Sequence, residues 1–139
     1  MIDINNPGNI RPLENDTYKG QIGIVNGFIH FFSMAYGIRA WLMNFHAAVV
    51  THGRTNLTQY ITAYAPPKEN DTAGYIEKMC NITTMKPEQA FDLSFAQTEE
   101  IMRAQFIIEN GMVIASKITD SDWLNGFELF TTDVPNFIK

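Results

Sequence analysis

Apolar side chains recur at intervals of three and four residues along most of this chain. The clearest segment begins near Ala35 and ends before Gly53, which is a candidate C-cap. Its apolar residues are Ile38, Trp41, Leu42, Phe45 and Val49. This spacing places all five on one face and predicts an amphipathic helix of about four turns.

Three more helices are expected in the middle of the chain. Thr55 is the expected N-cap of the first, which Pro66-Pro67 ends because proline has no amide hydrogen to donate. Asn70 or Asp71 would cap the second. Pro87 suits the first turn of a third, short helix.

Two helices are expected in the C-terminal third. Ser94 and Gln97 form a capping box for a helix over Phe95–Glu109, which Asn110-Gly111 would close. An extended link over 112–115 then leads to a terminal helix over 120–130. The apolar residues that define the two helical faces are Ile101, Met102, Phe106, Ile108, Trp123, Leu124 and Phe127.

One hairpin interrupts the helical pattern. Asn26-Gly27, the strongest short hairpin signal, separates the β-prone segments 21–25 and 28–31. Upstream, residues 5–9 (Asn-Asn-Pro-Gly-Asn) predict a type II turn in which Gly8 takes a positive φ. With no linker between these parts, we expect a single mainly α domain over residues 1–139 with one small β-hairpin.

Composition removes several classes of function. Fifteen acidic residues against ten basic ones give a net charge of −5 without a basic cluster, so nucleic acid is not an expected partner. The single cysteine, Cys80, has no internal partner and is expected to be a small buried hydrophobe; the three histidines lack metal-ligand spacing, so neither metal nor cofactor is expected. No apolar run reaches the roughly 20 residues of a membrane span and no secretory signal opens the chain, which predicts synthesis in the cytoplasm and no membrane insertion.

The segment from Tyr64 to Tyr75 carries the most suggestive chemistry. A stiff Pro66-Pro67 pair is followed by Glu69, with tyrosines on either side. Cleavage of a glycosidic bond needs a carboxyl group that burial keeps protonated, so that it can donate its proton to the leaving oxygen. The alternative is purely structural: Asp71 or Asn70 caps a helix and Glu69 is a solvated charge in its first turn.

The combination of Asn5–Arg11, Gly37–Ala40, Ala65-Pro66-Pro67, Glu69–Thr72 and Tyr75 resembles a family of small phage lytic proteins. Members occur in prophages, are often labelled virion structural proteins, and are related to the cell-wall-degrading enzyme of enveloped double-stranded-RNA phages. The resemblance covers about residues 5–83. It implies a lysozyme-like, mostly helical fold and cleavage of the peptidoglycan glycan strand by a lytic transglycosylase or muramidase.

The resemblance also implies roles for individual residues. Glu69 is the implied catalytic acid. The implied substrate-binding or cleft-shaping residues are Asn6, Asn9, Arg11, Arg39, Tyr64, Asn70, Asp71, Thr72 and Tyr75. Each arginine either binds substrate or pairs with a carboxylate such as Asp71. The family's usual Arg-Trp pair before Ala-Pro-Pro is Ala63-Tyr64 here, and a hairpin tryptophan is replaced by Tyr18.

Other aromatic residues are expected to be structural. The aromatic stripe of Phe28, Phe31, Phe32, Tyr36, Trp41 and Phe45 is interpreted as core rather than as a sugar platform. Tyr64 and Tyr75 are the better sugar-stacking candidates because they flank the motif.

Two hypotheses of different class follow. In the first, a phage lysin cleaves the bond between N-acetylmuramic acid and N-acetylglucosamine in the periplasm, through Glu69 alone if it is a transglycosylase. Hydrolysis would require a second carboxylate, for which Asp71 or Glu14 is the candidate. In the second hypothesis, the chain is a non-catalytic virion or glycan-binding protein that retains the fold. The sequence leaves the oligomeric state open.

Overall fold

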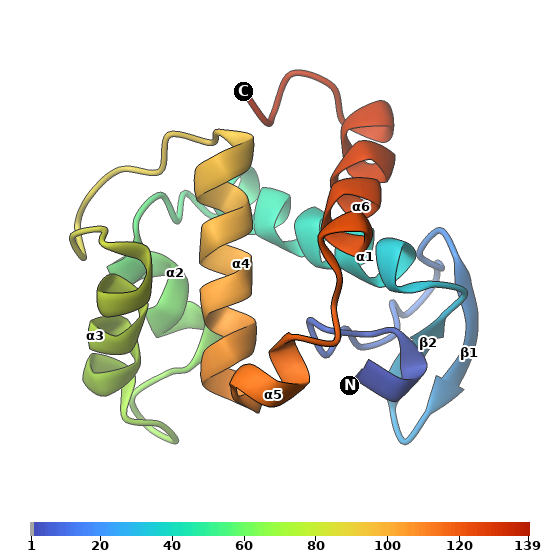
Figure 1. The fold of residues 1–139 in the computed structure, drawn as a ribbon, viewed down its shortest axis with the longest axis horizontal. Helices are drawn as coiled ribbons and strands as arrows, with labels where there is room; N and C mark the ends of the chain where they lie inside the picture. The colour runs from blue at the N-terminus through green and yellow to red at the C-terminus, as the bar shows by residue number, and fades with distance from the viewer. Residues whose placement is uncertain (1) are drawn as a thin grey trace. The chain divides into compact units, whose positions relative to one another are not determined.

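The computed structural model describes residues 2–139 (Figure 1). Its elements, in chain order, are η1 (Ile2–Ile4), β1 (Gln21–Val25), β2 (Phe28–Phe31), α1 (Met34–His46), η2 (Ala47–Thr51), α2 (Leu57–Tyr64), α3 (Thr72–Thr83), α4 (Phe95–Asn110), α5 (Met112–Ala115) and α6 (Asp120–Asp133). Helices hold 54% of the chain, and β1 and β2 are the only strands within residues 2–139. The mainly helical class with one small hairpin is therefore confirmed.

Contacts group the described residues into two compact units. The first unit consists of residues 2–46 and 116–137, which include the hairpin, α1 and α6. The second unit consists of residues 47–115 and 138–139, which include η2 and α2 to α5. The single catalytic domain over residues 1–139 stays a prediction.

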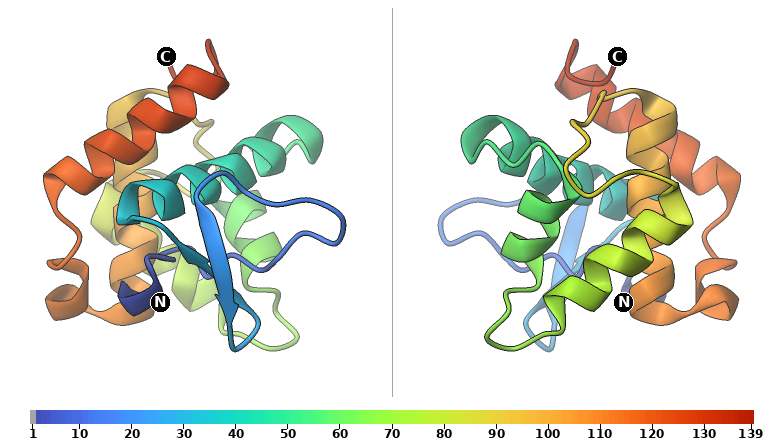
Figure 2. Two further views of the ribbon diagram at one scale, coloured as in Figure 1. Left: turned by 90° about the vertical axis from the view of Figure 1, so that its right-hand side faces the viewer. Right: turned by 90° about the vertical axis from the view of Figure 1, so that its left-hand side faces the viewer.

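In the first unit, α6 crosses α1 at close range (Figure 2). The contact is close because Gly126 has no side chain: a Cβ there would lie 2.5 Å from Cγ2 of Ile38. The large apolar side chains that the two helices bury are Ile38, Trp41, Leu42, Phe45, Trp123, Phe127 and Phe130. These residues form the core of the unit.

The hairpin forms as predicted. Asn26 and Gly27 take φ values of 51° and 83°, as a two-residue type I′ turn requires. Ile24 is paired with Ile29 in an antiparallel register, and an irregularity follows between Gln21 and Gly23.

The loop of residues 5–9 differs from the predicted type II turn. Asn5 and Asn9, rather than Gly8, take positive φ values of 56° and 52°. Asparagine tolerates this region because its short side chain can hydrogen-bond locally. Gly8 matters for another reason: a Cβ there would lie 2.6 Å from Cγ of Trp41, so the glycine lets the loop approach the indole.

The first long helix also ends differently from the prediction. Its α-helical part stops at His46, and residues Ala47–Thr51 form a π-helix. The wider π turn shifts the buried face by one residue, so that Ala48 is buried and Val49 is only half-buried. Gly53 follows with a φ of 64°, and its N–H donates to the carbonyl of Val49.

Two predicted N-caps are refined by the structure. Asn56, not Thr55, caps α2, because its side chain accepts a hydrogen bond from the Gln59 N–H at 2.9 Å. Asp71, the second of the two alternatives, caps α3 and accepts from the Gly74 N–H at 3.1 Å.

Two local predictions are wrong. Pro87 does not begin a helix; it occupies the second position of a turn that the Gln89 N–H closes on the Lys86 carbonyl at 3.1 Å. The φ fixed by proline suits that position as well as a first helical turn. Residues 112–115 form the short helix α5 rather than an extended link.

The helix α4 begins and ends as predicted, within one residue. Ser94 accepts a hydrogen bond from the Gln97 N–H at 3.0 Å, and Gly111 follows the helix with a φ of 84°. The Gln97 side chain, however, accepts from the Asp92 N–H at 2.8 Å, while Ser94 N–H donates to the Asp92 carboxylate at 2.7 Å. The cap is therefore a three-residue arrangement rather than a simple capping box.

Several residues expected to be buried are more exposed. Leu124 is 48% exposed because it lies one position beyond Trp123, off the buried face of α6. Phe32 is 70% exposed, since it follows the buried Phe31 and alternate strand residues face opposite sides. Four more residues of the expected core are half-buried: Phe28, Tyr36, Cys80 and Ile108.

Candidate functional site

The predicted catalytic segment is a short loop between α2 and α3 in the second unit. Three hydrogen bonds shape it: the Thr72 hydroxyl donates to the Ala65 carbonyl at 2.5 Å, and the Glu69 N–H and the Asn70 amide both donate to the Pro66 carbonyl at 3.1 Å. Thr72 itself is buried. The diproline and these bonds give the loop a fixed shape.

Glu69 lies on the outside of this loop. Its side chain is exposed, and none of the described residues of its own unit hydrogen-bonds to its carboxylate. The motif had suggested a carboxyl group already buried among aromatic rings. Instead, this carboxyl group is open to water.

Two tyrosines mark the helices on either side of the loop. Tyr64 is the last residue of α2 and is 39% exposed, and its ring meets the ring of Tyr75 on α3 edge to face, with centroids 6.2 Å apart. The Tyr75 hydroxyl donates to Oε1 of Glu109 on α4 at 2.8 Å. The two rings are therefore held in a fixed mutual orientation.

A buried glutamine completes this tyrosine cluster. Gln105 is fully buried, and its Oε1 accepts from the Tyr60 hydroxyl at 2.9 Å. Its Nε2 lies near the Tyr64 hydroxyl, but the geometry falls short of a hydrogen bond. Sequence reasoning missed Gln105 and Glu109, although two polar residues four positions apart on the expected apolar face of a helix were a usable signal.

Burial and the Glu109 carboxylate both raise the pKa values of Tyr64 and Tyr75. Burial, reinforced by the negative charge of Glu109 and opposed by the Gln105 amide, raises the pKa of Tyr64 to about 12. Burial and the hydrogen bond to Glu109 raise the pKa of Tyr75 still further. Both hydroxyls therefore stay protonated at neutral pH, and that of Tyr75 donates to Glu109.

Three of the predicted residues in the first unit support its loop. Asn6 is fully buried: its amide donates to the carbonyls of Ile10 and Ile29 at 2.9 Å, and its Oδ1 accepts from the Ile10 N–H at 2.8 Å. Asn9 takes the positive φ already described. The guanidinium of Arg11 lies over the Phe28 ring, 4.4 Å from its centroid, which is the geometry of a cation–π contact.

Arg39 pairs with a carboxylate, as one of the two alternatives predicted, but the partner is Asp133 rather than Asp71. Arg39 is 8% exposed and bonds Asp133 through Nε and a terminal nitrogen, both at 3.1 Å. Lys19 donates to the same carboxylate at 2.9 Å. Lys19 and Arg39 hold the pKa of Asp133 below its usual range.

The predicted site residues thus fall into two groups. Tyr64, Tyr75 and the segment 69–72 lie together in the second unit, whereas Asn6, Asn9, Arg11 and Arg39 belong to the first unit. Whether the two groups form one site stays a prediction. Within residues 2–139, no three His, Cys, Asp or Glu side chains are placed to hold a metal ion.

No known family model and no curated protein matches the sequence of this chain. Among the described residues, no helix has both the length and the apolar character needed to cross a bilayer.

Proposed function

We propose that this chain is a phage enzyme that cleaves the β-1,4 bond between N-acetylmuramic acid and N-acetylglucosamine in bacterial peptidoglycan. One observation supports the proposal beyond the sequence resemblance. An exposed carboxylate, Glu69, projects from a hydrogen-bonded loop that joins two helices bearing a fixed pair of tyrosines, Tyr64 and Tyr75. A general acid must come within hydrogen-bond distance of the glycosidic oxygen, and the position of Glu69 on this loop allows a glycan to reach it.

In the proposed mechanism, Glu69 donates its proton to the glycosidic oxygen. The exposed ring of Tyr64 offers a face on which a sugar can stack, while the Glu109 hydrogen bond keeps Tyr75 in place behind it. A bound glycan covers Glu69 and excludes water from it. That desolvation raises the pKa of a carboxyl group, so substrate binding itself favours the protonated acid.

The position of Asp71 helps to choose between hydrolysis and transglycosylation. Its carboxylate accepts the Gly74 N–H as the N-cap of α3, which leaves it poorly suited to activate water or attack the sugar. Hydrolysis needs a second carboxylate about 5–9.5 Å from the acid, whereas a transglycosylase uses the C6 hydroxyl of the muramic acid residue as its nucleophile. We therefore favour a lytic transglycosylase that releases 1,6-anhydromuramic products and uses Glu69 as acid and then as base.

A second candidate is a non-catalytic virion or glycan-binding protein, and the exposure of Glu69 favours it. A catalytic acid is more often partly buried in the free enzyme, where its pKa is already raised. In this case the tyrosine pair would bind glycan and no bond would be cleaved.

Incubation of the chain with outer-membrane-permeabilised Gram-negative cells separates the two candidates. An enzyme lowers the turbidity of the suspension and releases soluble fragments, and mass spectrometry of these fragments identifies the reaction. Anhydromuramic ends indicate a transglycosylase, and reducing muramic ends a muramidase. Constant turbidity with retention of the chain on the cell wall contradicts the enzymatic proposal.

A further inference from the structure

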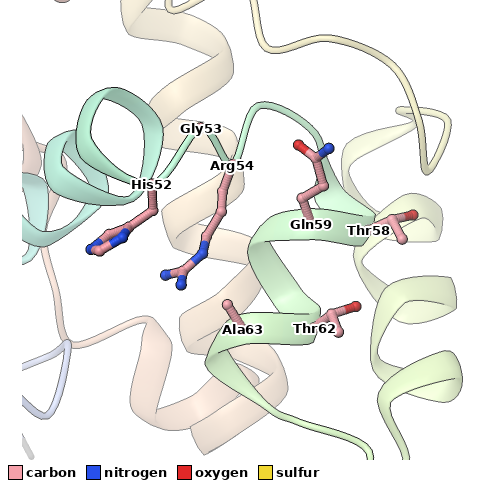
Figure 3. A pocket seen from close by; sticks show the side chains of 7 residues that line it. All are labelled: His52, Gly53, Arg54, Thr58, Gln59, Thr62 and Ala63. Carbon is pink, nitrogen blue, oxygen red and sulfur yellow. The ribbon is translucent and has the colours of Figure 1, made fainter.

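A groove of about 460 Å³ lies in the second unit, between the end of η2 and one face of α2. Its main lining residues are His52, Arg54, Thr58, Gln59, Thr62 and Ala63. In Figure 3, His52 and Arg54 lie on one side of the view, and Thr58 and Thr62 lie on the other. The mechanism proposed above uses none of these residues.

The π-helical segment positions the basic side of this groove. The Arg54 N–H donates to the Ala48 carbonyl at 3.0 Å, and the His52 N–H donates to the Ala47 carbonyl at 3.2 Å. Gly53 between them takes a φ of 64°, which turns the chain out of the helix. Single π-helical turns of this kind occur frequently at functional sites.

Arg54 is a half-buried cation, and no carboxylate among the described residues of its unit pairs with it. In the same unit Arg103 pairs with Glu99 at 3.2 Å, and in the other unit Arg39 pairs with Asp133. Arg11 lies over the Phe28 ring instead, whereas Arg54 has neither an ionic nor an aromatic partner among the described residues of its unit. Its planar guanidinium can bind one carboxylate through two parallel hydrogen bonds.

The other lining residues indicate what kind of molecule could carry a carboxylate to Arg54. Ala63 and the threonine methyl groups supply apolar surface, and Gln59 is fixed by accepting from the Thr55 N–H at 2.9 Å. On the far side, the Thr58 hydroxyl is bonded to the Glu88 carboxylate at 3.0 Å, and Glu88 itself does not line the groove. The volume lies in the range of sites that hold small organic ligands.

We propose that this groove binds a short anionic peptide, with a peptide carboxylate on Arg54 and small side chains against Ala63. The inference rests on the proposed function in one respect: peptidoglycan carries peptide stems with free carboxylates, which makes them the natural source of such a ligand. The groove would then be a second point of attachment to the substrate, apart from the glycan-cleaving loop.

Calorimetric titration of the full chain with N-acetyl-alanyl-glutamate and with its uncharged diamide tests the proposal. The wild type should bind the dipeptide about tenfold more tightly than the diamide, a difference of about 1.4 kcal/mol, because a hydrogen bond to a charged group is stronger than one to a neutral amide. Arg54→Gln should abolish this preference and Arg54→Lys should retain part of it. Lys78→Gln, which removes an exposed cation from α3 in the same unit, should leave the preference unchanged.

Several results would overturn the proposal: no binding of the dipeptide by the wild type, equal binding of dipeptide and diamide, or an unchanged preference in folded Arg54→Gln. Inorganic phosphate that displaces the dipeptide at equal affinity would show a general anion site instead of a peptide site. Because the dipeptide has no glycosidic bond, these outcomes do not depend on glycan cleavage. A chain that binds the dipeptide but leaves cell walls intact would contradict the proposed enzyme and not the groove.

Discussion

Tyr75 and Glu109 form a hydrogen bond between a neutral donor and an ionised acceptor, one of the stronger kinds in proteins. The bond joins α3 to α4 and fixes the ring that supports Tyr64. It also places a negative charge near two phenols. At the residue scale, Glu109 therefore controls both the geometry and the titration of the proposed sugar platform.

Replacing Glu109 with glutamine tests this control. Glu109→Gln should lower the pKa of Tyr64 from about 12, because a negative charge that opposes its ionisation is removed. The pKa of Tyr75 should fall in the same direction. The absorbance of the phenolates, followed during an alkaline titration, measures both shifts. Glu100→Gln, at an exposed position of α4, is the control, and identical titration curves for all three proteins would refute the assignment.

The ion pairs of Asp133 lead to a second prediction at the residue scale, which concerns how the free energy of unfolding depends on pH. Its pKa is lowered by Lys19 and Arg39, so its contribution is complete above the ordinary value of 3.8 and is lost as the pH falls through the lowered value. Asp133→Asn should therefore reduce the free energy of unfolding at about pH 7, and the difference from wild type should be smaller at an acidic pH well below the ordinary value of 3.8. Urea unfolding at the two pH values measures this, with Glu128→Gln on α6 as control. A difference that does not depend on pH would contradict the account.

At the scale of helices and strands, tertiary packing determines the structure of a segment wherever its sequence carries no strong local signal. The hairpin and α4 were predictable because Asn26-Gly27 and Ser94 restrict the backbone locally. The π-helix η2, which follows α1, was not predictable, because a three-to-four spacing continues through Val49 and nothing in the sequence marks the extra residue. The helix predicted at Pro87 was wrong for a similar reason, since the fixed φ of proline fits both a turn and the start of a helix.

Substitution of Gly37 tests how closely the loop of residues 5–9 packs against α1. Alanine is the better helix former by about 1 kcal/mol, yet a Cβ at Gly37 would lie 1.8 Å from the backbone oxygen of Asn5. Because that contact forces backbone to move, Gly37→Ala should lower the free energy of unfolding by about 2 kcal/mol or more. Gly23→Ala is the matched control, since a Cβ there meets nothing within 4 Å. Equal stability of the two variants in urea unfolding would show that the loop of residues 5–9 does not pack tightly on α1.

At the scale of the whole molecule, the class of fold was predictable but the partners of the site residues were not. Arg39 and Asp133 are 94 positions apart, and Tyr75 and Glu109 are 34 apart, so no local pattern links either pair. Such pairs depend on how helices pack. We expect the loop around Arg11 to lie near Glu69, since the resemblance implies one cleft; that approach also depends on packing, and it stays a prediction because the two segments belong to different units.

The central claim is that Glu69 is the catalytic acid, and digestion of purified peptidoglycan by wild type and Glu69→Gln tests it most directly. The amide keeps the shape of the side chain but has no proton to donate, so release of soluble fragments should fall by about 100-fold or more. Co-sedimentation with peptidoglycan should be unchanged. Glu77→Gln, an exposed carboxylate on α3, is the matched control and should digest like the wild type. Near wild-type digestion by folded Glu69→Gln would contradict the account.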